Sequence, residues 1–206
     1  MKQFFLTSCA DQVLADLIKY LPFPPQGTSV AFIDTAAEVE SGDHWWVTAD
    51  RNALTQFGFV VDQFSLTGLA IEQIEIKIKD KKIIFVAGGN TFFLLDQMIK
   101  TGFDQILKRK LSEGIIYIGS SAGSMVIGQG IDVASTIDER SKAPGLKSNG
   151  LGIIDLAILP HWGGPDFKEE YYQGFESMYN ENYKLIPLNN QQYLIIDGQN
   201  YQIIQT

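Results

Sequence analysis

The sequence predicts an α/β protein built on a mainly parallel β-sheet with helices on both faces. Short apolar runs of strand length alternate with segments of helical periodicity, which is typical of βαβ units. Residues that can carry chemistry, at 88–90, 121 and 161, follow directly after apolar runs. Because ligands bind beyond the carboxyl ends of the strands in such sheets, this shared position predicts one active site there.

The strands are predicted where short apolar runs occur, over residues 3–8, 29–34, 59–65, 83–87, 115–119 and 156–159. Helices are predicted where apolar residues recur at helical spacing, over residues 10–20, 44–57, 91–100 and 103–111. A cluster of prolines and a glycine between residues 22 and 27 separates the first helix from the second strand.

The last third of the chain is less regular. Residues 135–152 are polar and contain glycine, which favours a loop or a short hairpin. Residues 166–183 are predicted to be helical, with a break or bend at Gly174. Residues 193–204 are predicted to form a hairpin that turns at Asp197-Gly198.

The composition is that of one globular domain, residues 1–206, with 45% apolar and 19% charged residues. The net charge of −8 argues against nucleic-acid binding, which needs a basic surface. No apolar run is long enough to span a membrane, and Asp11 interrupts the N-terminal run that would otherwise suggest a signal peptide. A single cysteine suits a reducing compartment. We therefore expect a cytoplasmic monomer or homodimer without a nucleic-acid or membrane partner.

The segment Gly119-Ser120-Ser121-Ala122-Gly123 links an apolar run to a segment that can open a helix. Strand, G-x-S-x-G and helix together form the pattern of a nucleophile elbow, in which a sharp turn exposes the central serine above the sheet edge. A Cβ at either glycine would collide with this tight backbone. Ser121 is thus the candidate nucleophile, and the spacing does not select Ser120 or Ser124.

A serine hydroxyl is a poor nucleophile until a base takes its proton, and the chain offers two histidines. His161 follows the apolar run 156–159 and therefore lies at the predicted sheet edge. His44 lies near the start of a predicted helix, where a surface or capping role is common. His161 is the candidate base.

The turn Gly88-Gly89-Asn90 joins a predicted strand to a predicted helix. It is either a tight connection that needs glycine or an oxyanion hole, because bare amides at a helix N-terminus stabilise a developing negative charge. In the second interpretation the amides of Gly89 and Ala122 are the two donors. The G-x-G-x-x-G and Walker spacings are absent, so no nucleotide is expected.

Cys9 also follows a predicted strand, but no partner is suggested for it. Lone cysteines usually pack as small apolar residues, so we expect Cys9 in the core. Two separated histidines without H-x-x-x-H spacing fall short of a metal-ligand set. The sequence therefore predicts an enzyme that uses neither a cofactor nor a metal.

The elbow around Ser121, the loop Gly88-Gly89-Asn90 and the dipeptide Pro160-His161 occur in the order of the peptidase E (S51) family, which the chain resembles over essentially its whole length. The resemblance implies a flavodoxin-like, class I glutamine amidotransferase-like α/β sandwich, with serine where the amidotransferases carry cysteine. It also implies a dipeptidase E-like serine peptidase that hydrolyses short peptides. Family members include aspartyl dipeptidases and cyanophycinases, which cut aspartyl–arginine units.

The resemblance also implies roles for the residues singled out above. Ser121 attacks the scissile carbonyl, His161 transfers the proton to the leaving amine, and the two backbone amides hold the oxyanion. Gly88 and Asn90 are expected to bind the substrate.

The sequence offers more than one candidate for the third member of the triad. The dipeptidases carry a glutamate after the histidine, whereas the matching segment here, residues 185–192, contains no acid. Asn190, or else Asn189, would orient the imidazole without adding charge. Asp138, which resembles an aspartate of the dipeptidases, is the acidic alternative.

The residues expected to set the substrate preference also differ from the family pattern. Aspartyl dipeptidases are expected to hold the substrate carboxylate with an arginine downstream of the catalytic histidine, but every arginine here precedes His161. Lys168 is the nearest cation and the remaining candidate for substrate binding, although a lysine does not reproduce a bidentate clamp. The glutamates that follow it, Glu169 and Glu170, favour a cationic substrate instead.

Three functions are consistent with these residues. The first is a serine peptidase acting on small peptides. The second is an esterase of the α/β-hydrolase type, which lacks its HGGG-type loop here and would need Asp138 or Asp155 as its acid. The third is a catalytically weak or inactive ligand-binding homologue. The missing acid favours this last function, and the retained Ser121 and His161 oppose it.

Overall fold

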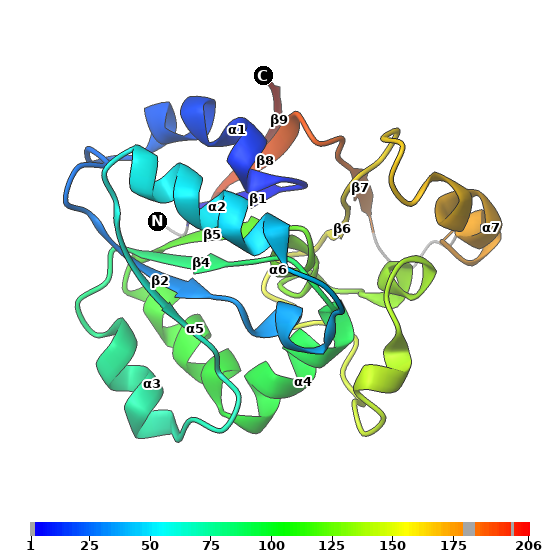
Figure 1. Ribbon diagram of the computed structural model, residues 1–206, viewed down its shortest axis with the longest axis horizontal. Coiled ribbons are helices and arrows are strands. Elements are labelled where there is room, and N and C mark those ends of the chain that lie inside the picture. The colour runs from blue at the N-terminus through cyan, green and yellow to red at the C-terminus, as the bar shows by residue number, and fades with distance from the viewer. Residues whose placement is uncertain (1–2, 179–183, 199) are drawn as a thin grey trace.

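In the computed structural model, the described part of the chain (residues 3–178, 184–198 and 200–206) forms a seven-stranded sheet between two layers of helices (Figure 1). The strand order is β3-β2-β4-β5-β1-β8-β9. Strands β1 to β5 run parallel, and β8 and β9 add an antiparallel hairpin at one edge. The strands of this sheet are β1 (Gln3–Thr7), β2 (Ser29–Ile33), β3 (Val60–Phe64), β4 (Ile83–Val86), β5 (Ile116–Ser120), β8 (Gln192–Asp197) and β9 (Asn200–Gln205).

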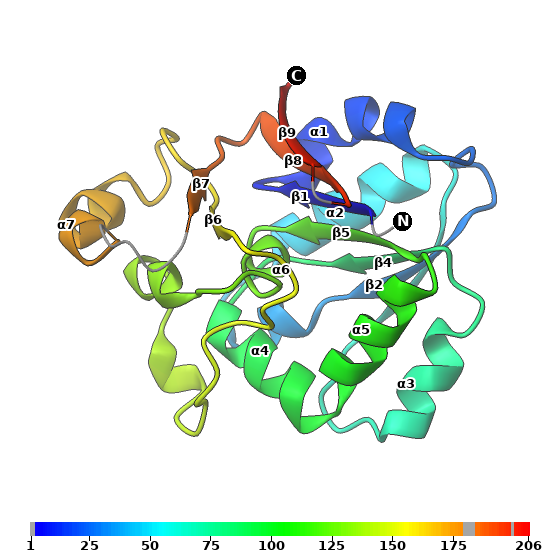
Figure 2. The same cartoon turned by 180° about the vertical axis from the view of Figure 1, so that it is seen from behind.

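Two apolar cores form because helices cover both faces of the sheet. Helices α1 (Ala10–Leu17) and α2 (Trp45–Gln56) pack on one face. On the other face lie α3 (Ile71–Ile78), α4 (Thr91–Lys100) and α5 (Phe103–Ser112), which Figure 2 shows from their own side. Strand β4 is buried along its whole length, as expected for a parallel strand with helices above and below it. The α/β fold class predicted from the sequence is confirmed.

A second, smaller sheet lies beside the main one. Strands β6 (Ala157–Leu159) and β7 (Leu185–Pro187) pair in parallel, and both views place them together with α7 (Lys168–Met178) at one side of the main sheet (Figures 1 and 2). This sheet carries the loops that contribute His161 and Asn190 to the site described below. Among the described residues, no helix has the length and apolar character needed to cross a membrane.

Three segments differ from the sequence prediction. Helix α3 lies in a segment to which no element is assigned above. The isoleucines at 74, 76 and 78 alternate at strand spacing in the sequence, but the helix buries Ile74 and Ile78 and leaves Ile76 75% exposed. Strand β7 is likewise not predicted. The loop or hairpin expected over residues 135–152 instead contains the 3₁₀-helix η4 (Arg140–Lys142) and the end of η3 (Asp132–Thr136).

Helix α7 and the C-terminal hairpin match their predictions with adjusted ends. Helix α7 runs through Gly174 without a break, and residues 179–183 of the predicted helix lie outside the described residues. A Cβ at Gly174 would lie 2.1 Å from the Cγ2 of Thr136, so the glycine lets α7 approach η3 closely. In the hairpin, Asp197 pairs with Asn200 and is the last residue of its strand, while Gly198 has a φ of +63°.

The connection from β5 to α6 (Ala122–Met125) is packed backbone against backbone. A Cβ at Gly119 would lie 2.6 Å from the carbonyl oxygen of Gly123, and a Cβ at Gly123 would lie 2.0 Å from that of Val86. The Tyr117 hydroxyl donates a 2.6 Å hydrogen bond to the Gly123 carbonyl and fixes it further. Both glycines of the G-x-S-x-G pattern are therefore required by close approach of the chain.

Substitution Gly123→Ala is expected to lower the free energy of unfolding by about 3 kcal/mol, the upper end for overpacking, because the new methyl group would overlap the β4 backbone. Chemical denaturation followed by circular dichroism measures this. Gly145→Ala is the matched control, since nothing lies within 4 Å of the Cβ that would be added there. Equal stability of the two variants would contradict this account of the turn.

Candidate active site

Ser121 stands at the sharp turn between β5 and α6. Its backbone has φ 49° and ψ −111°, a conformation that a non-glycine residue adopts only when its surroundings enforce it. The Ser121 amide donates to the Thr7 carbonyl at 3.0 Å, and the Ser121 carbonyl accepts from the amides of Ser124 and Met125. These bonds hold the strained turn and leave the Ser121 side chain partly exposed above the sheet.

His161 comes from the loop after β6 and meets Ser121 from the side. Its Nε2 lies 2.9 Å from the Ser121 Oγ. The His161 backbone also has a positive φ, 59°, and its amide donates to the Ser8 hydroxyl, which in turn donates to the Leu188 carbonyl at 3.1 Å. The loop of the small sheet is thereby anchored to the end of β1 in the main sheet.

Asn190 lies behind His161, in the segment between β7 and β8. Its side-chain oxygen is 2.9 Å from the His161 Nδ1. Because an amide oxygen only accepts, Nδ1 carries the hydrogen and Nε2 presents its lone pair to the Ser121 hydroxyl. This is the tautomer that a general base needs.

The pKa of His161 lies below its ordinary value of 6.5 because the imidazole is largely buried. The hydrogen bond with Asn190 and the charge of Asp166 oppose this shift, and burial outweighs them. The imidazole is therefore neutral at pH 7 and able to accept a proton.

The other two candidates for the residue behind His161 are bound elsewhere. The Asn189 side-chain oxygen accepts from the Gln191 amide at 2.8 Å within its own turn. An Asp138 oxygen accepts from the Thr91 amide at 2.9 Å and so caps helix α4. Burial raises the pKa of Asp138 to about 6. Of the three alternatives, the structure brings only Asn190 against the imidazole.

The glycine turn after β4 runs alongside the nucleophile. A Cβ at Gly88 would lie 3.1 Å from the Cβ of Ser121, and a Cβ at Gly89 would lie 2.3 Å from the carbonyl oxygen of Ala36. Among the described residues, neither the Gly89 amide nor the Ala122 amide donates a hydrogen bond. Two unpaired amides beside Ser121 are what an oxyanion hole requires.

Two residues predicted to bind substrate have other contacts. The Asn90 side chain is 1% exposed, accepts from the Phe93 amide at 3.0 Å and donates to the Glu139 carbonyl at 3.3 Å, so it caps α4 instead of facing a substrate. The Lys168 ammonium lies 6.0 Å from the centre of the Tyr172 ring, and Lys168 is not among the residues that line the cavity around Ser121.

That cavity has a volume of about 540 Å³, enough for a small peptide. Ser121, His161, Asn190, Gly88 and Gly89 all line it. The candidate nucleophile, the base with its orienting amide and the glycine turn thus open onto one space at the carboxyl edge of the sheet.

Cys9 is not in the core, contrary to the sequence expectation. It lines the cavity, with its sulfur 3.8 Å from the His161 Nδ1. Burial, and then the charges of nearby aspartates, raise the pKa of this thiol to about 12. The thiol is therefore protonated at neutral pH, and it is a poor competitor to Ser121 as nucleophile.

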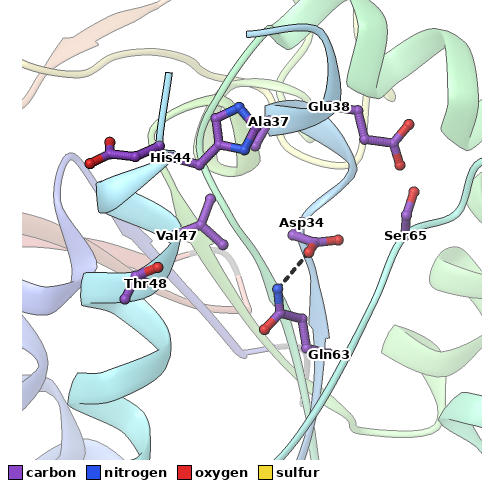
Figure 3. Close-up of a pocket in the computed structure, with 9 residues that line it drawn as sticks. Asp34, Ala37, Glu38, His44, Val47, Thr48, Gln63 and Ser65 are labelled. Atoms are coloured by element: carbon purple, nitrogen blue, oxygen red, sulfur yellow. Dashed lines mark hydrogen bonds between the residues drawn. The ribbon is translucent and has the colours of Figure 1, made fainter. Parts of the chain in front are cut away.

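His44 belongs to a different cavity, of about 370 Å³, shown in Figure 3. Its ring nitrogen Nε2 lies 3.0 Å from the Glu40 carbonyl oxygen. Across this cavity, Gln63 donates to the Asp34 carboxylate at 2.6 Å. Neither Ser121 nor His161 lines it, and the described residues contain no cluster of three or more side chains suited to a metal ion.

Among the residues not predicted from the sequence, two hold the positions of the base and the glycine turn. Ser8 holds the His161 amide, and the Trp46 indole donates to the Gly88 carbonyl at 3.1 Å. Ser8 follows directly after β1, so the rule that places ligand sites at strand ends could have selected it. The contact of Trp46 with the glycine turn depends on how α2 packs and leaves no local signal.

The chain is similar to known peptidases over most of its length. The profile of peptidase family S51 matches residues 5–204. The uncharacterized peptidase Lmo0363 of Listeria monocytogenes is 33% identical over 199 residues, 96% of each chain. Peptidase E of Streptomyces coelicolor is 28% identical over 145 residues, which is 70% of this chain and 55% of that protein.

A solved structure shows the same arrangement of the chain. The crystal structure of a protein from L. monocytogenes EGD-e, assigned as a peptidase E, has a TM-score of 0.92 at 30% identity and covers 100% of this chain and 99% of that one. Since the family profile and this relative both extend over nearly the whole length, the chain belongs to peptidase family S51, the peptidase E family of serine peptidases.

Proposed function

We propose that the protein hydrolyses short peptides next to a free N-terminus, with Ser121 as nucleophile, His161 as base and Asn190 as the residue that orients the base. The observation that carries this proposal is the chain of two 2.9 Å contacts, Ser121 Oγ to His161 Nε2 and His161 Nδ1 to Asn190 Oδ1. A nucleophile, a base and an orienting group within hydrogen-bond reach are the geometric signature of acyl transfer.

The reaction follows from these positions. The Ser121 oxygen attacks the scissile carbonyl carbon while its proton passes to the His161 Nε2, and the carbonyl oxygen takes up negative charge between the amides of Gly89 and Ala122. Collapse of this intermediate breaks the peptide bond, and His161 gives the proton to the leaving amine. A water molecule, deprotonated by His161, then attacks the acyl-enzyme and releases the first product together with Ser121.

Specificity for N-terminal aspartate has no support in the cavity. No arginine or lysine belongs to the described residues that line it, so a bidentate clamp for a substrate carboxylate is absent from that part of the chain. We also propose a cytoplasmic location, on the basis of the single cysteine of the chain.

A ligand-binding protein without turnover is the second candidate, and the neutral Asn190 is the observation that favours it. An amide orients the imidazole, but it stabilises the imidazolium less than a carboxylate does, so activation of Ser121 is weaker. Hydrolysis that depends on Ser121 distinguishes the two functions.

Substitution Ser121→Ala is expected to lower kcat/KM for any cleaved peptide by at least about three orders of magnitude, because burial keeps the Cys9 thiol, the other nucleophile considered at this cavity, protonated. A panel of N-terminally unblocked dipeptides, with release of free amines as the readout, measures this. Ser120→Ala is the matched control, since the Ser120 hydroxyl accepts from the Ala10 amide, whereas the hydroxyl within 2.9 Å of the His161 Nε2 is that of Ser121. Activity retained in Ser121→Ala would overturn the mechanism, and a folded wild-type protein that cleaves nothing would favour the binding function.

The pH profile of the wild-type enzyme reports on the base. Burial lowers the pKa of His161, and the neutral imidazole is the active form. On the acid side, kcat/KM is therefore expected to fall with a midpoint below 6.5, the pKa of an ordinary histidine. A midpoint at or above that value would show that a different group, or a more solvated histidine, controls the rate.

Substitution of Asn190 tests its positioning role. With Asn190→Asp, a carboxylate beside Nδ1 favours the imidazolium, so the acid midpoint is expected to move up by about one pH unit. The plateau kcat is expected to rise about fivefold through the charge-assisted hydrogen bond. Asn190→Ala removes the hydrogen bond and is expected to lower kcat about tenfold.

A purely structural role for Asn190 would alter thermal stability in both variants and leave the midpoint unchanged. Rates are therefore measured across the pH range, together with the thermal unfolding midpoint of each variant.

A further inference from the structure

The cavity around Ser121 is strongly acidic. Its lining residues include six carboxylates and, among the described residues, no lysine or arginine. The six are Asp11, Glu40, Asp50, Asp138, Asp166 and Glu170. The charge of this site is therefore opposite to the one that would hold an acidic substrate side chain.

The described residues supply no cationic partner to these carboxylates. Elsewhere in the described chain, ion pairs join lysines and arginines to acidic side chains, as in Lys81 with Asp62 and Arg109 with Glu113. None of the six cavity carboxylates forms an ion pair with a described residue. Their charge is thus available to a cation that enters the cavity.

The six differ in how deeply they are buried. Burial raises the pKa of Asp50 to about 7 and that of Asp138 to about 6, so these two ionise incompletely until a cation lies beside them. Asp166, just before α7, and Glu170, in its first turn, are exposed, and Glu40 and Asp11 are half-buried. We therefore assign the main attraction for a cation to these last four side chains.

The arrangement suits an extended ligand better than a metal ion. The carboxylates come from separate elements, and no three of the described acidic, histidine or cysteine side chains lie close enough to hold one ion. Trp45, which is 63% exposed, and Phe167 also line the cavity. Aromatic faces beside carboxylates accommodate the aliphatic stem and the charged head of a lysine or arginine side chain.

We propose that the site selects short peptides that carry a lysine or arginine next to the scissile bond, in addition to their free amino group. The scissile bond is that of the proposed function, on which this inference rests. Unpaired carboxylates on several sides of the cavity and aromatic side chains in its wall define the specificity. An aspartyl or glutamyl side chain in the same place would meet charges of its own sign.

Binding to the Ser121→Ala protein tests the selectivity without relying on turnover. Isothermal titration calorimetry compares the affinities of dipeptides in which alanine is paired with lysine, methionine or glutamate. Each pair is tested with alanine as the first residue and as the second. In at least one of the two residue orders, the dipeptide that contains lysine is expected to bind about fivefold more tightly than the dipeptide that contains methionine in its place. The dipeptide that contains glutamate is expected to bind most weakly. This preference is expected to shrink at high salt, because the charges face solvent.

A further substitution, in helix α7, tests which side chain causes the preference for lysyl peptides. Glu170→Gln in the Ser121→Ala protein is expected to reduce the ratio of lysyl to methionyl affinity about threefold. Glu169→Gln is the matched control, because Glu169 is not among the cavity residues and accepts instead from the Gln173 side chain at 3.1 Å. An equal loss in both variants would contradict the role of Glu170.

The outcomes separate this inference from the proposed function. Methionyl or glutamyl peptides that bind as tightly as lysyl peptides in both orders would overturn the selectivity even if the wild-type enzyme cleaves them. Folded protein that binds none of the peptides would overturn it as well. Selective binding of lysyl peptides by a wild-type protein that cleaves nothing would support the ligand class and contradict the peptidase mechanism.

Discussion

The close contact between the Gly123 backbone and the Val86 carbonyl is the constraint on which the site depends. It brings the start of α6 against the end of β4, so the chain leaves β5 through a turn that only the φ of 49° at Ser121 can make. The same approach places the Gly88 turn beside the nucleophile and leaves the Ala122 amide unpaired. The positions of the nucleophile and of the oxyanion donors therefore depend on one packing contact between the start of α6 and the end of β4.

The base reaches this turn from a separate sheet, and a few hydrogen bonds fix its position. The Ser8 hydroxyl links the His161 amide to the Leu188 carbonyl, and the Leu188 amide donates to Leu159 at 2.9 Å. Strands β6 and β7 are thus tied to each other and to the end of β1. The imidazole position depends on this small sheet, which is why His161 and Asn190 arrive together although they are 29 residues apart.

The parts of the fold that can be predicted from the sequence are those whose physical requirement produces a local residue pattern. Strands buried on both faces must be continuous apolar runs, and a tight turn at Ser121 must have glycines around it. The sheet and the nucleophile elbow can therefore be predicted from the sequence. The partner of His161 is set by loop packing, so the sequence puts Asn190 first but leaves Asn189 and Asp138 open as alternatives until the fold is known. Asn90 is different, because asparagine just before a helix is itself an N-cap signal that favours the structural role found here.

The neutral side chain of Asn190 and the acidic side chains that line the cavity have related effects on the charge of His161. In a cavity lined by carboxylates such as Asp166, a further carboxylate at position 190 would stabilise the imidazolium and leave less of the neutral base at pH 7. The Asn190 amide sets the tautomer without that charge, and burial then keeps the imidazole neutral. Where the cavity is itself anionic, a neutral orienting group preserves the base, and the charge that the triad gives up is already present in the walls that face the substrate.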